Sequence, residues 1–545
     1  MRKFLLFLAP LFLFADISLK ELQDAPEGHV RNFNIWQYMQ QDISPEDAQR
    51  AYELTKGYNH KIFIKYAKKT DDKKVLEQSR CSNLKTASLL NESNASCISQ
   101  ALNLSRAMNL SFRQRDALSQ SLNEKHSDKS ELILLMNSKS FVLDALKSGE
   151  KNYLKLFNSL GTKNRQEYFN VKLSAERINS LAQEKAFNRS IKYIVTDSKM
   201  HRMQESLLLL KGCDLTAESY FFLALNALKF KATKKASHYL EISQKKAYYQ
   251  FNKDKAVFWK YLITNDEAFL NELSTSTDIN IYTLYAKEKL DLEVKNYFSA
   301  LELKDKPSQI NLNNPYVWEK TLDVIRATKP NELTELLQRY NSKEDEVLHA
   351  FIYSKMHKYK EHNYILPYKK ATESLSNDDK ALLYALARQE SHFIPSAISR
   401  SYALGVMQMM PFLIKALAKQ KGESLTLNDM FDPYTNITYA KEHIAYLQKH
   451  LYHPLFIAYA YNGGIGFTKR HLLQGSFLKG SFEPYLSMEL MANTESREYG
   501  KKVLANYVVY KKILKEEIKI IPLLEKLTVP AHTDRFRIKA LVLNH

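Results

Sequence analysis

Apolar residues recur at helical spacing through the middle of the chain. In the segment AESYFFLALNALKFKATKKASHYLEIS, residues 217–243, one apolar face is followed, after a short basic turn, by a second. The residues of the two faces are Phe221, Ala224, Leu225 and Leu228, and then Ala236, Tyr239 and Leu240. Similar helix pairs are predicted over residues 130–146, 154–181, 217–242, 256–273 and 281–303.

Proline and glycine are scarce over the same region. No proline occurs between Pro45 and Pro307, and the glycines there are Gly57, Gly149, Gly161 and Gly212. Strands and tight turns need these residues whereas helices exclude them, so the region is predicted to be helical throughout. The helix pairs show no strict period, which favours a degenerate α-solenoid. An irregular helical bundle is the alternative, and it is less favoured because one compact core rarely extends over so many residues.

A boundary is predicted at the segment YILPYKKAT, residues 364–372, where Pro367 interrupts the helical pattern. Glycine becomes denser beyond it, which indicates a compact domain in which loops contribute. The expected order is a signal peptide at 1–15, an α-helical superhelical domain at 16–300, a helical linker domain at 301–370 and a compact domain at 371–545. The predicted fold class is all-α, with an N-terminal α-solenoid or superhelix of helix pairs followed by a mainly α domain that carries the chemistry.

The chain opens MRKFLLFLAPLFLFAD, which has the layout of a secretory signal peptide. Two basic residues precede a short apolar run, and Ala15 is the small residue before the expected cut. The run is short for a membrane span, although a retained anchor is the alternative. In an exported chain Cys81 and Cys97 can pair, which would leave Cys213 as a lone buried thiol.

Lys and Arg exceed Asp and Glu by 79 − 60 = 19, and the isoelectric point is about 9.3. A basic chain favours polyanions or anionic surfaces. An exported protein meets little nucleic acid, whereas the bacterial cell wall is also anionic. A third reading is that the charge only keeps the protein soluble.

Glu390 is predicted to continue the apolar face of a helix. Ser376, followed by acidic residues, is typical of an N-cap, and Leu383, Leu386 and Glu390 then fall at i, i+3 and i+7. Partial burial and the negative end of the helix dipole would both raise the pKa of this carboxyl group, which suits a general acid. The ordinary alternative is a helix-end glutamate that faces water.

Further segments follow in order: ALGVMQMMP at 403–411, MFDPYTNI at 430–437, AYAYNGG at 458–464 and ESREYGKKVL at 495–504. Together with the Glu390–Ser391 pair, they resemble the catalytic domain of soluble lytic murein transglycosylases, a lysozyme-like fold preceded by an α-helical superhelix. The resemblance covers roughly the last third of the chain. Departures from the family pattern, which leave the fine substrate preference open, are Phe393, Leu404, Val406 and Gly464.

The resemblance implies an exported enzyme that cleaves the β-1,4 bond between N-acetylmuramic acid and N-acetylglucosamine. Glu390 would protonate the bridging oxygen and then take the proton of the muramoyl C6 hydroxyl, which gives 1,6-anhydromuramoyl products. No second carboxylate, metal or cofactor is implied. The residues expected to bind substrate or support Glu390 are Ser391, Ser399, Gly405, Met407, Gln408, Met410, Tyr461, Asn462, Glu495 and Tyr499.

The expected partners are peptidoglycan glycan strands in the periplasm, with no nucleic acid and no stable membrane anchor after signal cleavage. We expect a monomer that can meet other cell-wall enzymes, and a superhelix that curves around the glycan strand. One rival is a hydrolytic muramidase that uses Asp429, Glu489 or Glu495 as a second carboxylate. The other is a non-catalytic solenoid scaffold that binds glycan. Glu495 could instead pair with Arg497 or Lys501 on the surface, and the spacing of His443, His450 and His453 is poor for a metal site.

Overall fold

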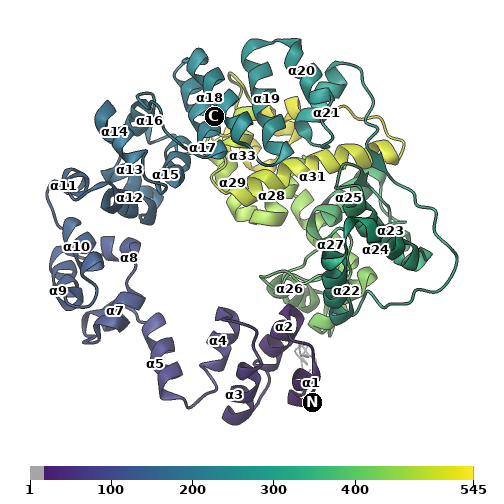
Figure 1. The fold of residues 1–545 in the computed structure, drawn as a ribbon, viewed down its shortest axis with the longest axis horizontal. Helices are drawn as coiled ribbons and strands as arrows, with labels where there is room; N and C mark the ends of the chain where they lie inside the picture. The colour runs from purple at the N-terminus through teal and green to yellow at the C-terminus, as the bar shows by residue number, and fades with distance from the viewer. Residues whose placement is uncertain (1–16, 544–545) are drawn as a thin grey trace, which may run out of the picture. The chain divides into compact units, whose positions relative to one another are not determined.

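The computed structural model describes residues 17–543, and the expected signal peptide at 1–15 lies outside them. The described chain is mainly helical, as predicted (Figure 1). Its packing divides it into two compact units. Unit 1 combines the chain up to Thr70 with 274–487 and 493–545, and unit 2 contains 71–273 and 488–492. The four-part division expected from the sequence stays a prediction.

Unit 2 is a stack of short helices, most of which contact helices close to them in sequence. This pattern of neighbour contacts is typical of a solenoid. Its helices are α5 (Lys73–Ser82), α6 (Thr86–Leu90), α7 (Ala95–Ala101), α8 (Leu104–Met108), α9 (Phe112–Leu122), α10 (Ser127–Leu135), α11 (Phe141–Lys147), α12 (Glu150–Ser159), α13 (Thr162–Tyr168), α14 (Ala175–Leu181), α15 (Phe187–Val195), α16 (His201–Leu207), α17 (Ala217–Lys229), α18 (Thr233–Lys246), α19 (Gln250–Thr264) and α20 (Glu267–Ser274).

The helix pair at 217–246 bears out the apolar faces predicted for it. Phe221 and Leu225 in α17, and Tyr239 and Leu240 in α18, are buried. Burial in α17 is wider than one face, because α15, α16 and α18 all pack against it. The helix therefore forms the centre of this part of the stack, where its apolar surface is removed from water.

A disulfide joins Cys81 in α5 to Cys97 in α7. The pairing suggested by the sequence is therefore present, and it crosslinks two helices of unit 2. Cys213 lies in the connection between α16 and α17 and is half-buried. The expectation of a buried thiol was wrong, because this residue sits on a surface loop beside Gly212 and not on an inward helix face.

Unit 1 begins with four short helices and resumes after unit 2 with a helical segment that contains one small parallel strand pair. The elements are α1 (Leu19–Asp24), α2 (His29–Tyr38), α3 (Pro45–Glu53), α4 (His60–Tyr66), α21 (Ile281–Lys289), β1 (Tyr297–Phe298), α22 (Pro315–Ala327), η1 (Pro330–Glu332), α23 (Leu333–Arg339), η2 (Lys343–Asp345), α24 (Glu346–Met356) and β2 (His362–Asn363).

The helix pair predicted at 281–303 is only partly correct. The helix ends at Lys289, and Asp291 has a left-handed backbone with φ of 52°. The chain then runs extended, and Tyr297–Phe298 pairs in parallel with His362–Asn363. Two adjacent aromatic residues suit a strand, and the partner strand lies too far along the chain to be visible in local periodicity.

The rest of the chain, which belongs to unit 1 except for residues 488–492, contains α31, against which both α25 and α28 pack. Gly500 allows the approach of α28, because a Cβ atom there would lie 2.2 Å from the Tyr459 ring. The elements are η3 (Lys369–Ala371), α25 (Asn377–Ser391), α26 (Pro411–Lys421), η4 (Leu427–Phe431), α27 (Pro433–Gln448), α28 (Pro454–Gly463), α29 (Ile465–Leu473), α30 (Tyr485–Glu489), α31 (Thr494–Ile513), α32 (Ile520–Glu525), η5 (Lys526–Thr528), η6 (Pro530–His532) and α33 (Arg535–Leu543).

Tyr402 joins the N-terminal helices to the C-terminal part of unit 1. Its ring is buried, and its centroid lies 5.1 Å from that of Trp36 and 5.4 Å from that of Phe33, both in α2. Asn59 donates a hydrogen bond to the Tyr402 hydroxyl at 2.8 Å. The Lys61 ammonium lies 4.6 Å from the ring centroid and within the range of a cation–π contact.

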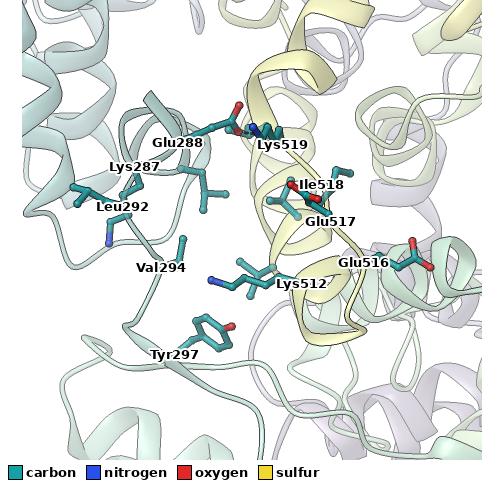
Figure 2. A pocket seen from close by; sticks show the side chains of 14 residues that line it. Lys287, Glu288, Leu292, Val294, Tyr297, Lys512, Glu516, Glu517, Ile518 and Lys519 are labelled. Carbon is teal, nitrogen blue, oxygen red and sulfur yellow. Dashed lines mark hydrogen bonds between the residues drawn. The ribbon is translucent and has the colours of Figure 1, made fainter. Parts of the chain in front are cut away.

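A cavity of about 260 Å³ lies between α21 and the segment that follows α31 (Figure 2). Lys287 lines it from one side and Lys512 from the other. At its edge the Glu288 carboxylate accepts a hydrogen bond from the Ile520 amide at 2.5 Å and so satisfies the N-terminus of α32. None of the predicted site residues lines this cavity, so it is separate from the candidate active site. No helix among residues 17–543 is long and apolar enough to cross a bilayer.

Candidate active site

Glu390 lies in the last turn of α25. The predicted N-cap is confirmed, because the Ser376 hydroxyl accepts a hydrogen bond from the Asp379 amide at 3.1 Å. Leu383 and Leu386 are buried, and Glu390, on the same face, is half-buried. The helix ends just beyond, where His392 takes a left-handed conformation. The carboxyl group therefore sits at the negative end of a well-capped helix.

The Tyr499 hydroxyl donates a hydrogen bond to Glu390 Oε1 at 2.6 Å. The pKa of Glu390 is raised to about 7: burial is the largest cause, the Tyr499 hydrogen bond opposes it, and the charge of Glu495 adds to the rise. The raised pKa expected from the sequence is thus present. A carboxyl group of this kind carries a proton for much of the time near neutral pH and can donate it.

Tyr461, in α28, is the second tyrosine beside Glu390. Its hydroxyl donates to the Met407 carbonyl oxygen at 2.7 Å. Burial and the nearby Glu390 charge raise the pKa of Tyr461 well above its ordinary range, and the same causes act on the pKa of Tyr499. Both phenols therefore stay protonated and act as hydrogen-bond donors. Tyr461 ties the 403–411 loop to α28, while Tyr499 fixes one oxygen of Glu390.

The loop that carries Gly405 and Met407 is held by Asn436 of α27. The Asn436 Oδ1 atom accepts from the Met407 amide at 2.8 Å, and its Nδ2 donates to the Leu404 carbonyl at 2.9 Å. Gly405 has φ of 76°, and a Cβ atom on it would lie 2.3 Å from Asn436 Nδ2. Only glycine fits this backbone and this close approach. Asn436 was not among the predicted site residues, although it lies in the MFDPYTNI segment quoted for the resemblance.

Three predicted substrate-binding residues use their polar groups inside this same loop. The Ser391 hydroxyl donates to the Val406 carbonyl at 2.7 Å. Ser399 Oγ accepts from the Ala403 amide at 2.9 Å. Gln408 Nε2 donates to the carbonyl oxygens of Ala397 at 3.0 Å and Gly405 at 2.9 Å. Ser391, Ser399 and Gln408 thus fix the shape of the loop beside Glu390.

The two predicted methionines differ in exposure. Met407 is buried and contributes its carbonyl group to Tyr461. Met410 is half-buried and precedes the first residue of α26. Of the two side chains, only that of Met410 presents an appreciable surface to solvent.

Asn462 and Glu495 are joined directly. Asn462 Nδ2 donates to Glu495 Oε1 at 3.1 Å, and Ser496 Oγ donates to Asn462 Oδ1 at 2.7 Å. Glu495 is exposed. The surface ion pairs considered for it were wrong, because Arg497 and Lys501 pair with Glu498. Glu495 is therefore held near Glu390 by an amide and not neutralised by a cation.

Other carboxylates proposed as second catalytic groups have different surroundings. Asp429 closes a capping box with Thr426 at the start of η4. Glu489 is buried. Of the three candidates, Glu495 is the one whose charge raises the pKa of Glu390.

Residues 367–480 match the family model described as the transglycosylase SLT domain. The matched stretch contains Glu390 and the segments at 403–411, 430–437 and 458–464. Over 147 residues the chain is 32% identical to a Haemophilus influenzae protein named as a soluble lytic murein transglycosylase. The alignment spans 26% of this chain and 23% of that protein, which is less than a quarter of its length.

Two solved structures are similar over most of the chain. The 70 kDa soluble lytic transglycosylase of Escherichia coli has a TM-score of 0.50 and 16% identity, over 94% of this chain and 84% of that one. An inactive mutant of the lytic transglycosylase Slt from Pseudomonas aeruginosa has a TM-score of 0.50 and 14% identity, over 92% and 84%. At these identities the likeness shows the fold, and it confirms the predicted superhelix followed by a lysozyme-like domain. The sequence similarity of this chain to the transglycosylase SLT domain is thus placed at residues 367–480, which include Glu390.

Proposed function

We propose that the protein is a peptidoglycan lytic transglycosylase that cleaves the β-1,4 bond between N-acetylmuramic acid and N-acetylglucosamine. The observation that carries this proposal is Glu390, whose pKa burial raises to about 7 and whose Oε1 accepts a hydrogen bond from Tyr499. The SLT domain supports the same reaction class.

In the first step, Glu390 gives its proton to the oxygen that bridges the two sugars. Because Tyr499 occupies Oε1, the proton is carried on the other carboxyl oxygen, Oε2. The bond between the muramoyl C1 and the bridging oxygen breaks, and that oxygen leaves as the C4 hydroxyl of N-acetylglucosamine. The acetamido group of the muramoyl residue stabilises the positive charge that develops at C1. Tyr499 stabilises the carboxylate that remains.

In the second step, the C6 hydroxyl of the same muramoyl residue attacks C1. The Glu390 carboxylate takes its proton, which restores the acid and closes a 1,6-anhydro ring. The nucleophile belongs to the substrate, so its effective molarity is high and no bound water has to be positioned. A single carboxyl group is sufficient for this sequence, whereas hydrolysis normally uses two.

The remaining predicted residues take supporting roles in this proposal. Asn462, Glu495 and Met410 present polar or apolar surface to the sugar or its peptide. Ser391, Ser399, Gly405, Met407 and Gln408 shape the loop that forms one wall, and Tyr461 fixes that loop to α28.

Mass spectrometry of digested peptidoglycan tests the reaction. The wild type should release 1,6-anhydromuramoyl products, and Glu390→Gln should release none while keeping its fold. Glu442→Gln is a matched control, because Glu442 is exposed on α27, and it should digest like the wild type. Digestion by Glu390→Gln at the wild-type rate would remove Glu390 from its proposed role.

One observation keeps a hydrolytic muramidase as the second candidate. The charge of Glu495 raises the pKa of Glu390, as expected of a nearby second carboxylate. In that case the products would carry reducing muramic ends, and Glu495→Gln would abolish their release. If neither product type forms although glycan strands bind, the protein is the non-catalytic scaffold.

We also propose that the protein acts as a monomer on glycan strands in the periplasm. The Cys81–Cys97 disulfide supports export, since disulfides persist mainly in oxidising compartments. The excess of 19 basic residues supports an anionic partner. Alkylation of cell extracts tests the compartment: Cys81 and Cys97 should react only after reduction, and reaction without reduction would contradict export.

A further inference from the structure

Five aromatic side chains form a continuous row that begins at Tyr461. We call this set the aromatic row; its members in order are Tyr461, His443, Tyr446, His450 and Phe536. Successive ring centroids are 5.5, 6.3, 5.5 and 5.7 Å apart. The helices that supply them are α27, α28 and α33, which Figure 1 labels, with His450 just past the end of α27. All of them belong to unit 1.

Local sequence explains the middle of the row. His443, Tyr446 and His450 fall at i, i+3 and i+7, which places them along one side of α27 and its C-terminal turn. The side is not a buried face: Tyr446 is 46% exposed, and His443 and His450 are half-buried. The rings are therefore open to solvent, and aromatic side chains grouped on a surface are a common feature of ligand-binding sites.

The polar atoms of these three side chains are not used inside the protein. Among residues 17–543, the His443, Tyr446 and His450 side chains make no hydrogen bond to another residue. Burial lowers the pKa of His443 to about 4, so its ring is neutral at physiological pH and offers one donor and one acceptor. The row thus combines apolar ring surface with unused hydrogen-bonding groups.

The far end of the row carries a positive charge. The Lys469 ammonium, on α29, lies 5.5 Å from the centroid of the Phe536 ring. Lys469 is itself exposed. A ligand that follows the row from Tyr461 therefore meets aromatic rings, hydrogen-bonding groups and finally a cation that suits a carboxylate.

We propose that the aromatic row is a binding track for a chain of N-acetylated sugars, leading from Glu390 toward Lys469. Pyranose rings present C–H faces to aromatic side chains, and their hydroxyl and acetamido groups match the unused atoms of His443, Tyr446 and His450. Lys469 binds a carboxylate of the peptide that the strand carries. The track is continuous with the candidate active site through Tyr461, and it rests on the proposed function for the identity of its ligand.

Binding measurements on the inactive Glu390→Gln protein test the track without cleavage. The probes are N-acetylchitohexaose, long enough to extend along the row, and N-acetylchitobiose. Tyr446→Ala and Phe536→Ala should each weaken hexaose binding about five- to tenfold, the effect of losing one aromatic contact, and leave chitobiose binding unchanged. Tyr434→Ala is the matched control, because Tyr434 is 44% exposed on the same helix and lies outside the row.

Equal hexaose affinity in all variants, or an equal loss in Tyr434→Ala, would overturn the track. Circular dichroism and melting temperatures establish that each variant is folded.

The contact between Lys469 and a peptide carboxylate is tested separately. Lys469→Gln should weaken binding of peptide-bearing glycan strands about threefold at low salt and leave hexaose binding unchanged. An unchanged affinity for those strands would remove Lys469 from the track.

The two proposals fail in different ways. If the wild type releases no cleaved product but hexaose binds through Tyr446, the proposed reaction is wrong and the track stands. If cleavage is confirmed but the row variants bind hexaose normally, the track alone is wrong. In cleavage assays the row variants should raise KM for long strands and leave kcat unchanged, since they do not touch the reacting atoms.

Discussion

Two neighbours act on the Glu390 proton in opposite directions. The pKa of Glu390 is raised to about 7, chiefly by burial; the Tyr499 hydrogen bond favours the ionised form, and the Glu495 charge adds to the rise. Both neighbours lie on α31, Glu495 in its first turn and Tyr499 one turn further on. One helix therefore supplies both a group that raises the pKa of Glu390 and a group that lowers it. Substituting each residue in turn separates the two contributions.

The pH profile of kcat/KM tests this tuning. Because the acid form starts the reaction, activity should fall as pH rises through the pKa of Glu390. Glu495→Gln removes a charge that raises this pKa, so the alkaline limb should move to lower pH. Tyr499→Phe removes a hydrogen bond that lowers it, so the limb should move to higher pH. Shifts of the same sign in both variants would contradict the arrangement.

The Glu390 carboxyl group should also lower the stability of the folded protein above neutral pH. Its pKa is 4.5 in the unfolded chain and about 7 in the folded protein, so the unfolded chain loses this proton first as the pH rises. The free energy of unfolding should therefore fall between about pH 4.5 and 7. Glu390→Gln should therefore be about 1–3 kcal/mol more stable than the wild type at pH 8, and equally stable at pH 4. Urea unfolding at the two pH values measures the difference. If the wild type and Glu390→Gln were equally stable at pH 8, the surroundings of Glu390 would not destabilise its ionised form.

At the scale of elements, the catalytic loop depends on α27. Asn436 donates to two carbonyl groups, those of Leu404 and Met430, and accepts from the Met407 amide. All of these groups are buried, so no water replaces a lost partner. The conformation of the loop therefore depends on the hydrogen bonds of one side chain that lies outside the loop.

Asn436→Ala should destabilise the protein by about 2–4 kcal/mol and reduce turnover at least tenfold, because three buried backbone groups lose their partner. Thermal unfolding and product release measure the two effects. Thr438→Ala is the control: Thr438 lies two residues away on α27, is exposed, and bonds only to the Tyr434 carbonyl. The role of Asn436 would be refuted if both variants behaved alike.

The sequence predicted what local patterns determine. The Ser376 cap, the helix that carries Glu390 and the apolar faces of α17 and α18 all follow from nearest neighbours on a helix. The short strands β1 and β2 were missed because their partner residues are some 65 positions apart. The hydrogen bond from Tyr499 to Glu390 was missed for a related reason. It depends on how α25 packs against α31, and these two helices are far apart in the sequence. His443 and His450 were considered only as metal ligands, because their contact with Tyr461 crosses from one helix to another.

At the scale of the whole molecule, unit 1 is built from both halves of the chain. His29 in α2 donates from Nε2 to the Ser399 carbonyl at 3.0 Å, across 370 positions. Lys61 donates to the Ser401 carbonyl at 2.6 Å. These contacts surround Tyr402, three residues before Gly405. The loop beside Glu390 is therefore supported by residues from the start of the described chain.

Tyr402→Ala should lower the free energy of unfolding by about 3 kcal/mol and expose the segment 17–70 to proteases, because the ring fills the contact between the two parts. Limited proteolysis and thermal unfolding measure these effects. Tyr58→Ala is the control, since Tyr58 is 69% exposed on the same N-terminal segment. Protease resistance equal to that of the wild type would show that Tyr402 does not hold the segment in place.

A fragment that starts at residue 364 lacks these supports. It keeps α25, α27, α28 and α31, but Tyr402 loses Phe33, Trp36 and Asn59. We expect this fragment to digest peptidoglycan more slowly than the full chain and to lose any preference for strand ends that the superhelix provides. Product lengths from intact cell-wall sacculi measure this preference, and an unchanged preference would exclude a role for the superhelix.

The packing of the N-terminal helices against Tyr402 also affects the order in which the parts of the chain fold during synthesis. A chain emerging from its N-terminus presents α2 and α4 more than 300 residues before the surface that covers Phe33. Unit 2, whose contacts are local in sequence, can become structured during that interval, because contacts of short sequence separation form fastest. The apolar residues of α2 and α4 therefore stay exposed to solvent until the last third of the chain has been synthesised. The middle of this protein should therefore fold before its beginning, and the active-site loop should be completed only when the earliest and latest parts of the chain meet.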